Sequence, residues 1–272
     1  MGEAIVVTSG KGGVGKTTTT ANIATGLALR GKKVVMVDAD IGLRNLDVIM
    51  GLENRIVYDI IDVVDGVCRI KQALIRDKRF EGLYLLPAAQ TKDKDAITPA
   101  QVEKLMGDLK ETFDYVIIDC PAGIEQGFIN AVSAADQAVV VTVPEVSAVR
   151  DADRVIGLLS TFDLTAPKLL VNRIRSDMVR RGDMMNIHDI LEVLRVELVG
   201  VVPDDENIVP ASNMGIPIVS NPEHPAGRAY QNVADRLMGK PTPFMDLEPP
   251  RITLMSRFKR LFESSKAGGA VR

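Results

Sequence analysis

One short segment near the N-terminus limits the architectures open to this chain. It reads Gly10-Lys11-Gly12-Gly13-Val14-Gly15-Lys16-Thr17, and Thr18 follows it directly. Residues 4–8 before it are apolar or β-branched and predict a buried strand, whereas residues 16–30 after it predict a helix. A glycine-rich turn between a strand and a helix fits the pattern G-x-x-x-x-G-K-[ST], which is typical of a phosphate-binding loop.

The residue types of this loop suit the phosphates of a nucleotide. Glycines let the backbone wrap closely around phosphate oxygens, and the helix that follows adds the positive end of its dipole. Lys16 supplies a positive charge for the β- and γ-phosphates, and the Thr17 hydroxyl suits Mg²⁺. The alternative is a glycine-rich turn that binds nothing. The full match in the required context disfavours that alternative.

The rest of the chain predicts a mostly parallel, doubly wound α/β sheet with helices on both faces, the architecture of a P-loop hydrolase. Short apolar runs predict strands at 33–37, 83–86, 115–118, 138–143, 168–171 and 198–202. Helical patterns stand between them at 99–112, 125–135, 147–160, 185–195 and 225–238. Ligands of such sheets bind beyond the carboxyl ends of the strands. The motifs of this chain follow strands in the same way.

Acidic residues follow two of these predicted strands. Asp119 ends the run at 115–118, and we expect it to hold the Mg²⁺ shell through water. The alternative for a lone Asp at this place is a helix cap or a turn residue. Asp38 and Asp40 follow 33–37, and their spacing lets both carboxylates approach the same edge of the sheet. A solvated acidic turn is the alternative there.

The second lysine of the loop carries a family resemblance. The form Lys11-Gly12-Gly13-Val14-Gly15-Lys16-Thr17 resembles the deviant Walker A ATPases, also called the ParA/MinD family. The resemblance implies a homodimer formed on ATP, in which Lys11 reaches the partner's nucleotide and acts with Lys16 and Asp40 in catalysis. It assigns the hydrolytic water to Asp40 and a place in the Mg²⁺ water shell to Asp38. On physical grounds alone, Lys11 fits a surface charge beside an anion equally well.

The same resemblance points to the side of the site that holds the base. Asn172 and Arg173 follow one predicted strand, and Pro203 and Asp204 follow another. Both pairs are similar to the family's adenine-side segments. The alternative for Asn172 is an asparagine that stabilises its own turn. Gly123, in the segment after Asp119, is the residue whose backbone could adjust when the γ-phosphate leaves.

The composition changes near the C-terminus. We expect an ATPase domain over 1–238, a proline-rich linker over 239–250, an amphipathic helix over 251–263 and a disordered tail over 264–272. The helix could dock on the domain, or it could lie in a membrane interface. Its apolar and basic residues favour anionic lipid. These residues are Leu254, Met255, Phe258, Leu261 and Phe262, with Arg257, Lys259 and Arg260.

Residues 40–47 and 144–151, together with this C-terminal segment, resemble the septum-site-determining branch of the family over residues 3–262. That resemblance implies peripheral binding to the inner membrane, recruitment of a MinC-like division inhibitor and release by a MinE-like activator. Arg44, Glu53 and Asp151 lie in segments that contact partners in the family. Residues 264–272 depart from the pattern, because the family's tail usually ends soon after the amphipathic helix.

Composition and motifs weigh against the remaining alternative functions. The net charge of −3 gives no reason to expect nucleic acid as a partner, and the basic residues at the end alternate with Phe. This weighs against the main alternative, a ParA-type DNA-partitioning ATPase. Cys68 and Cys120 have no metal-binding spacing, which fits a reducing cytoplasm and argues against an iron–sulfur relative. No motif supports a metabolic substrate pocket, and Lys11, Asp40 and Asp119 argue against a scaffold that does not hydrolyse ATP.

Overall fold

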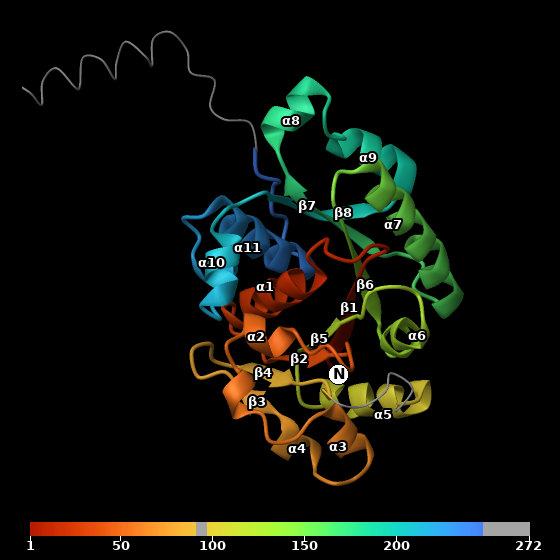
Figure 1. Cartoon of the computed structure of the whole chain (residues 1–272), viewed down its shortest axis with the longest axis vertical. Coiled ribbons are helices and arrows are strands. Elements are labelled where there is room, and N and C mark those ends of the chain that lie inside the picture. Colours follow the sequence, from red (N-terminus) through yellow and green to blue (C-terminus); the bar gives the residue numbers. More distant parts are fainter. Residues whose placement is uncertain (91–96, 247–272) are drawn as a thin grey trace, which may run out of the picture.

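The computed structural model describes residues 1–90 and 97–246. Within them lies an eight-stranded sheet in the order β3-β4-β2-β5-β1-β6-β7-β8 (Figure 1). Neighbouring strands pair in parallel, except that β3 pairs antiparallel with β4 at one edge. The predicted mostly parallel sheet is confirmed. The strands are β1 (Glu3–Thr8), β2 (Val34–Asp38), β3 (Ile75–Arg76), β4 (Leu83–Leu86), β5 (Tyr115–Asp119), β6 (Gln137–Thr142), β7 (Lys168–Ile174) and β8 (Glu197–Pro203).

Helices cover both faces of the sheet (Figure 1). One face packs against α1 (Lys16–Ala28), α2 (Leu46–Ile49), α10 (Ile208–Asn213), η4 (Ile218–Ser220) and α11 (Pro225–Leu237). The other packs against α3 (Ile60–Val64), α4 (Ile70–Ala73), α5 (Pro99–Lys110), α6 (Gln126–Ser133), α7 (Val146–Leu159) and α9 (Ile187–Leu194). The shorter elements η1 (Glu53–Arg55), η3 (Ser160–Phe162) and α8 (Ser176–Arg181) complete the described chain.

The strands are apolar throughout because each one buries side chains in two cores. In β1, Ala4 and Val6 join the core under α5, α6 and α7, while Ile5 and Val7 join the core under α1 and α11. Successive side chains of a strand point to opposite faces, so a sheet that is covered on both sides needs apolar residues at both positions. The predicted strands and helices are therefore found within a few residues of their expected bounds.

The topology brings the predicted motifs to one edge of the sheet. Strand β5 lies between β1 and β2, and Asp119 is the register partner of both Val7 and Asp38. Strand β1 continues into the glycine-rich loop, so this loop, Asp119 and Asp38 all lie at the carboxyl ends of three adjacent strands. Strand β1 lies in the interior of the sheet, with β5, β2, β4 and β3 on one side of it and β6, β7 and β8 on the other. The crevice beyond β1 and β6 is consequently the place where such sheets bind ligands.

The described chain ends beyond the predicted domain limit of residue 238. Residues 239–246, the first part of the predicted linker, turn back toward α11 and β8. The amphipathic helix expected at 251–263 and the tail at 264–272 lie outside the described residues. Among the residues that are described, no helix is long and apolar enough to cross a bilayer.

Candidate nucleotide-binding site

The loop after β1 has the local geometry of an anion site. Gly13 and Gly15 adopt positive φ angles of 78° and 98°, which L-residues with side chains rarely adopt. A Cβ atom placed on Gly12 or Gly13 would meet nothing within 4 Å, so one side of the loop is open. Gly15 is the N-cap of α1, and no side chain caps this helix. The first amides of α1 are thus left for a bound anion.

A buried lysine and two hydroxyl groups join this loop to β5. The Lys16 side chain lies at the start of α1 and is buried. One turn further along α1, the Thr20 hydroxyl donates a hydrogen bond of 3.0 Å to Oδ1 of Asp119. Thr17 also hydrogen-bonds to Asp119. The spacing of Thr17 and Thr20 on a helix could have suggested this second contact, but the motif drew attention to Thr17 alone.

The three predicted carboxylates meet at the ends of β2 and β5. Burial and the nearby Asp119 raise the pKa of Asp38 to about 8. Burial raises the pKa of Asp119 to about 6, although hydrogen bonds from Thr17 and Thr20 and the charge of Lys16 oppose the rise. Asp40 adds to the repulsion on both groups. A cation placed among these oxygens would relieve this repulsion, and oxygen atoms are the ligands that Mg²⁺ prefers.

Asp38 also holds the loop that follows it. Its Oδ1 accepts a hydrogen bond from the Asp40 amide at 3.0 Å, and its Oδ2 accepts one from the Leu46 amide at 3.3 Å. In the same loop, Nε of Arg44 lies 2.8 Å from Oδ2 of the buried Asp47. The Asp38 carboxylate therefore links the candidate metal site to the segment that carries Asp40.

The side chain of Lys11 forms an ion pair with an acidic residue of its own chain. Its Nζ is 3.0 Å from Oε2 of Glu145 and 3.4 Å from Oγ of Ser147, at the start of α7. Its side chain is 42% exposed, so it can leave this position without disturbing a core. The contact with Glu145 was not predicted, because the two residues are far apart in the sequence. A cleft of about 200 Å³ opens beside them, lined by Gly12, Gly13, Pro144 and Arg173 among others.

The residues predicted on the base side are brought together at the ends of β7 and β8. Ile174 and Pro203 are register partners, and the Asp204 amide donates to the Ile174 carbonyl at 3.0 Å. Nδ2 of the buried Asn172 donates to the Val14 carbonyl at 2.9 Å, and its Oδ1 accepts from the Arg173 amide. As described, Asn172 supports the phosphate loop and its own turn. A contact with the base stays a prediction.

The residues predicted on the partner surface differ in their exposure. Glu53 in η1 is exposed and Asp151 on α7 is partly exposed, whereas the Arg44 side chain is only 14% exposed and is paired with Asp47. Gly123 has a positive φ of 94°, a conformation that favours glycine, and the backbone adjustment there stays a prediction. Burial raises the pKa of the Cys120 thiol to about 12, so this cysteine behaves as a packed core residue.

The donor set fits a metal ion that is held mainly by a nucleotide. Across residues 1–90 and 97–246, no group of three or more His, Cys, Asp or Glu side chains could hold a metal ion by itself. Mg²⁺ usually keeps several waters and takes one or two protein ligands together with phosphate oxygens. The hydroxyl of Thr17 and the carboxylate of Asp119 meet that requirement.

Replacing Gly15 with alanine should destabilise the nucleotide-free domain by about 3 kcal/mol, because an added Cβ would be strained at this φ and would meet the Asn172 amide. The new atom would lie 2.5 Å from Nδ2 of Asn172. Urea denaturation without nucleotide measures the effect. Gly12→Ala is the matched control, since its Cβ would meet nothing within 4 Å. Equal free energies of unfolding for the two variants would contradict this account of the loop.

Comparison with known proteins agrees with this geometry. Residues 2–170 match the family described as AAA domain. The septum site-determining protein MinD of Bacillus subtilis is 57% identical over 264 residues, which cover 96% of this chain and 98% of the relative.

Two solved structures extend the comparison. In the MinC:MinD cell division protein complex of Aquifex aeolicus, the matching chain is 51% identical with a TM-score of 0.85, covering 90% of this chain and 98% of that one. MinD of Pyrococcus horikoshii, complexed with Mg-ADP, is 30% identical with a TM-score of 0.80, covering 87% and 96%.

Proposed function

Because this chain belongs to the family of septum site-determining MinD proteins, we propose that it is a membrane-switching ATPase that places the division septum. It dimerises on ATP, binds the cytoplasmic face of the inner membrane through residues 251–263 and recruits a MinC-like inhibitor. Hydrolysis stimulated by a MinE-like activator then releases it. The observation that carries the proposal is the cluster of Asp38, Asp40 and Asp119 beside the open phosphate loop.

The residues of the site divide the work of hydrolysis among them. The open loop Gly10–Thr17 and the uncapped start of α1 bind the phosphates, and Lys16 neutralises charge on them. Thr17 and Asp119 hold the Mg²⁺ shell, which Asp38 supports. The bound Mg²⁺ would supply charge stabilisation to the phosphates. Asp40 positions the attacking water, because it stands in the loop that Asp38 holds over the site.

Lys11 serves the partner's site in the dimer. Its exposed side chain lines the cleft beside the phosphate loop, where Glu145 and Ser147 are its polar contacts among the described residues. An ion pair between exposed groups is worth less than about 1 kcal/mol, so a partner's phosphates can displace Glu145. The cation then stabilises charge that develops during phosphoryl transfer.

The proposed partner surface uses residues that are at least partly exposed. Glu53 and Asp151 are accessible in the described structure, and we propose them as contacts for the inhibitor and the activator. The Aquifex aeolicus relative forms a complex with MinC, which supports an inhibitor of that type here. Arg44 can contribute only if its pair with Asp47 opens, because its side chain is mostly buried.

A chain that ends at Asp246 should lose ATP-dependent binding to anionic vesicles. The cut removes the basic and apolar residues of 251–263 and keeps residues 239–246, which contact the domain. Co-sedimentation with ATP and with ADP measures binding, and hydrolysis without lipid checks that the domain is intact. A full-length chain carrying Leu254→Asp and Phe258→Asp is the matched control and should also stay in solution.

Three other results of this experiment would contradict the proposal. Equal pelleting of the full and shortened chains would make residues 251–263 irrelevant to the membrane. Equal pelleting with ATP and ADP would remove the nucleotide switch. Absence of vesicle binding, together with ATP-dependent retention on DNA, would favour the alternative function of a ParA-type partitioning ATPase.

A further inference from the structure

The chain turns sharply after α11 and returns along the domain. Gly239 has a positive φ of 76°, and the Lys240 amide donates to the Asp235 carbonyl at 3.0 Å, which closes the end of the helix. Further on, Met245 packs against the core that lies under α1 and α11. The proline-rich stretch therefore begins as a segment held on the domain, although its composition is typical of a linker.

A single side chain makes polar contacts with both Thr242 and Pro243 of this segment. Nε of Arg236 donates to the Thr242 carbonyl at 2.9 Å, and one terminal nitrogen donates to the Pro243 carbonyl at 2.7 Å. The other terminal nitrogen donates to the Val199 carbonyl of β8 at 2.9 Å. The Phe244 ring lies under the guanidinium, 3.9 Å from its carbon to the ring centroid. Arg236 thus joins three backbone carbonyls and one aromatic ring.

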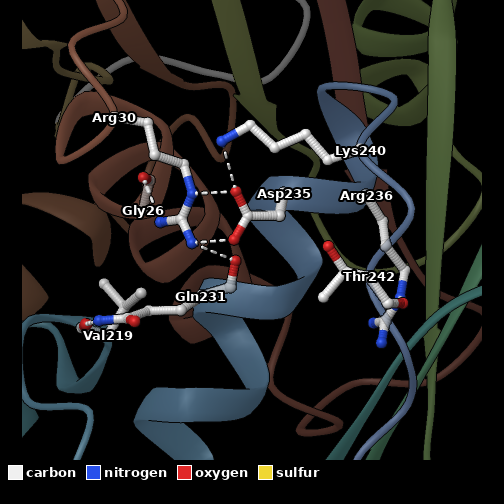
Figure 2. Close-up of polar contacts among 8 residues, drawn as sticks. All are labelled: Gly26, Arg30, Val219, Gln231, Asp235, Arg236, Lys240 and Thr242. Carbon is white, nitrogen blue, oxygen red and sulfur yellow. Dashed lines mark hydrogen bonds and ion pairs between the residues drawn. The ribbon is translucent and has the colours of Figure 1, made fainter.

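The helix that presents Arg236 is itself fixed to α1. Figure 2 shows Asp235 between Lys240 and Arg30, which lies in the turn after α1, whereas Arg236 points toward Thr242. Arg30 also donates to the carbonyls of Gly26 and Gln231 at 3.0 and 2.7 Å. The Asp235 carboxylate, held by these two cations, has a pKa well below its usual range. The part of α11 that carries Arg236 is therefore tied through Arg30 to α1, the helix that starts at the phosphate loop.

These contacts shorten the chain available to the C-terminal segment. From Lys240 to Arg251 there are 11 peptide steps, whereas from Asp246 there are 5. At up to about 3.6 Å per step, the reach falls from roughly 40 Å to roughly 18 Å. In the proposed dimer, a shorter tether keeps the two C-terminal segments at a higher effective concentration. This concentration varies as about the −3/2 power of the tether length.

We propose that Arg236 is a positioning residue, which fastens residues 242–244 to the domain so that the membrane-binding segment leaves from a fixed point on a short tether. This inference rests on the proposed membrane-binding function. Lysine cannot replace arginine here. The planar guanidinium reaches three carbonyls at once and stacks on Phe244, whereas an ammonium group presents a single point of charge.

The contact itself is tested on Arg236→Lys, with Arg228→Lys as the matched control. Arg228 is an exposed residue of the same helix α11, so its substitution makes the same chemical change away from residues 242–244. Limited digestion with chymotrypsin, followed by mass spectrometry, measures cleavage after Phe244. We expect cleavage of Arg236→Lys to be about tenfold faster than that of the wild type or the control. Equal rates would overturn the contact as the device that holds the segment.

Vesicle titration in the presence of ATP tests the consequence. The lipid concentration needed for half-maximal binding should rise about threefold in Arg236→Lys and stay unchanged in Arg228→Lys, because the tether lengthens from 5 to 11 steps. Hydrolysis without lipid should match the wild type, which shows that the domain of the variant is intact. Unchanged vesicle binding, despite faster cleavage, would overturn the positioning role. If the wild type itself does not bind vesicles, the proposed function fails, while the digestion still decides whether Arg236 holds the segment.

Discussion

Replacing Lys11 with alanine is expected to lower the rate of ATP hydrolysis about a thousandfold, which is the loss found when a cation supplied in trans is removed from a phosphoryl-transfer site. Binding of ATP to the single chain should change far less. The Lys11 side chain is exposed and lies on Glu145, away from the buried charge of Lys16. Steady-state hydrolysis and equilibrium binding of a fluorescent ATP analogue measure the two effects separately.

Mixing two inactive variants shows whether Lys11 acts across a dimer. A chain with Lys11→Ala keeps Asp40, and a chain with Asp40→Asn keeps Lys11. Each mixed dimer therefore has one complete site if the lysine comes from the partner. Random exchange should restore about a quarter of the wild-type rate, because half of the dimers are mixed and each has one of its two sites complete. No recovery on mixing would show that Lys11 serves its own chain.

The stability of the nucleotide-free and metal-free protein should fall by about 5 kcal/mol between pH 5 and pH 8. The pKa of Asp38 is raised to about 8 and that of Asp119 to about 6. In this interval the carboxyls of the unfolded chain are already ionised, whereas the folded chain loses the Asp119 proton near pH 6 and the Asp38 proton near pH 8. Stability is therefore fully present near pH 4 and is lost as the pH rises toward 8. Urea denaturation in EDTA at several pH values measures the slope.

The substitution Asp38→Asn should flatten that slope, because it removes the group with the higher pKa. The slope is more informative than the stability at one pH, since the amide cannot accept hydrogen bonds from both Asp40 and Leu46. Asp153→Asn, on the exposed side of α7, is the control, and its stability should depend on pH with the same slope as that of the wild type. An unchanged slope in Asp38→Asn would contradict the buried, protonated state of this carboxyl.

The sequence predicts well what depends on neighbouring residues and on repeating patterns. The strands were predictable because both of their faces are buried, as Ala4 and Ile5 in the two opposite cores illustrate. The phosphate loop was predictable because positive φ angles at Gly13 and Gly15 require glycine. Elements such as α8 and α10, of 6 residues each, were missed because they are too short to show a helical period.

Contacts between distant residues were not predictable in the same way. The pairing of Asp38 with Asp119 depends on β2 and β5 being neighbours, and strand order is not written in either strand. The contact between Lys11 and Glu145 spans the gap from the first loop to the start of α7. Arg236 donates hydrogen bonds to backbone carbonyls. Every residue has a backbone carbonyl, so the sequence does not show which residues accept these bonds.

The central position of β1 has a consequence for biosynthesis. This strand is made well before its partners in the sheet, since Val7 pairs with Asp119 and Thr8 with Val140. At a translation rate of 5–20 residues per second, a nascent chain waits roughly ten seconds for both partners. Pairings that are so distant in sequence also form slowly. During that interval an apolar strand is exposed outside the ribosome and is open to chaperones. The phosphate loop can take its final shape only after β5 and β6 have both been synthesised.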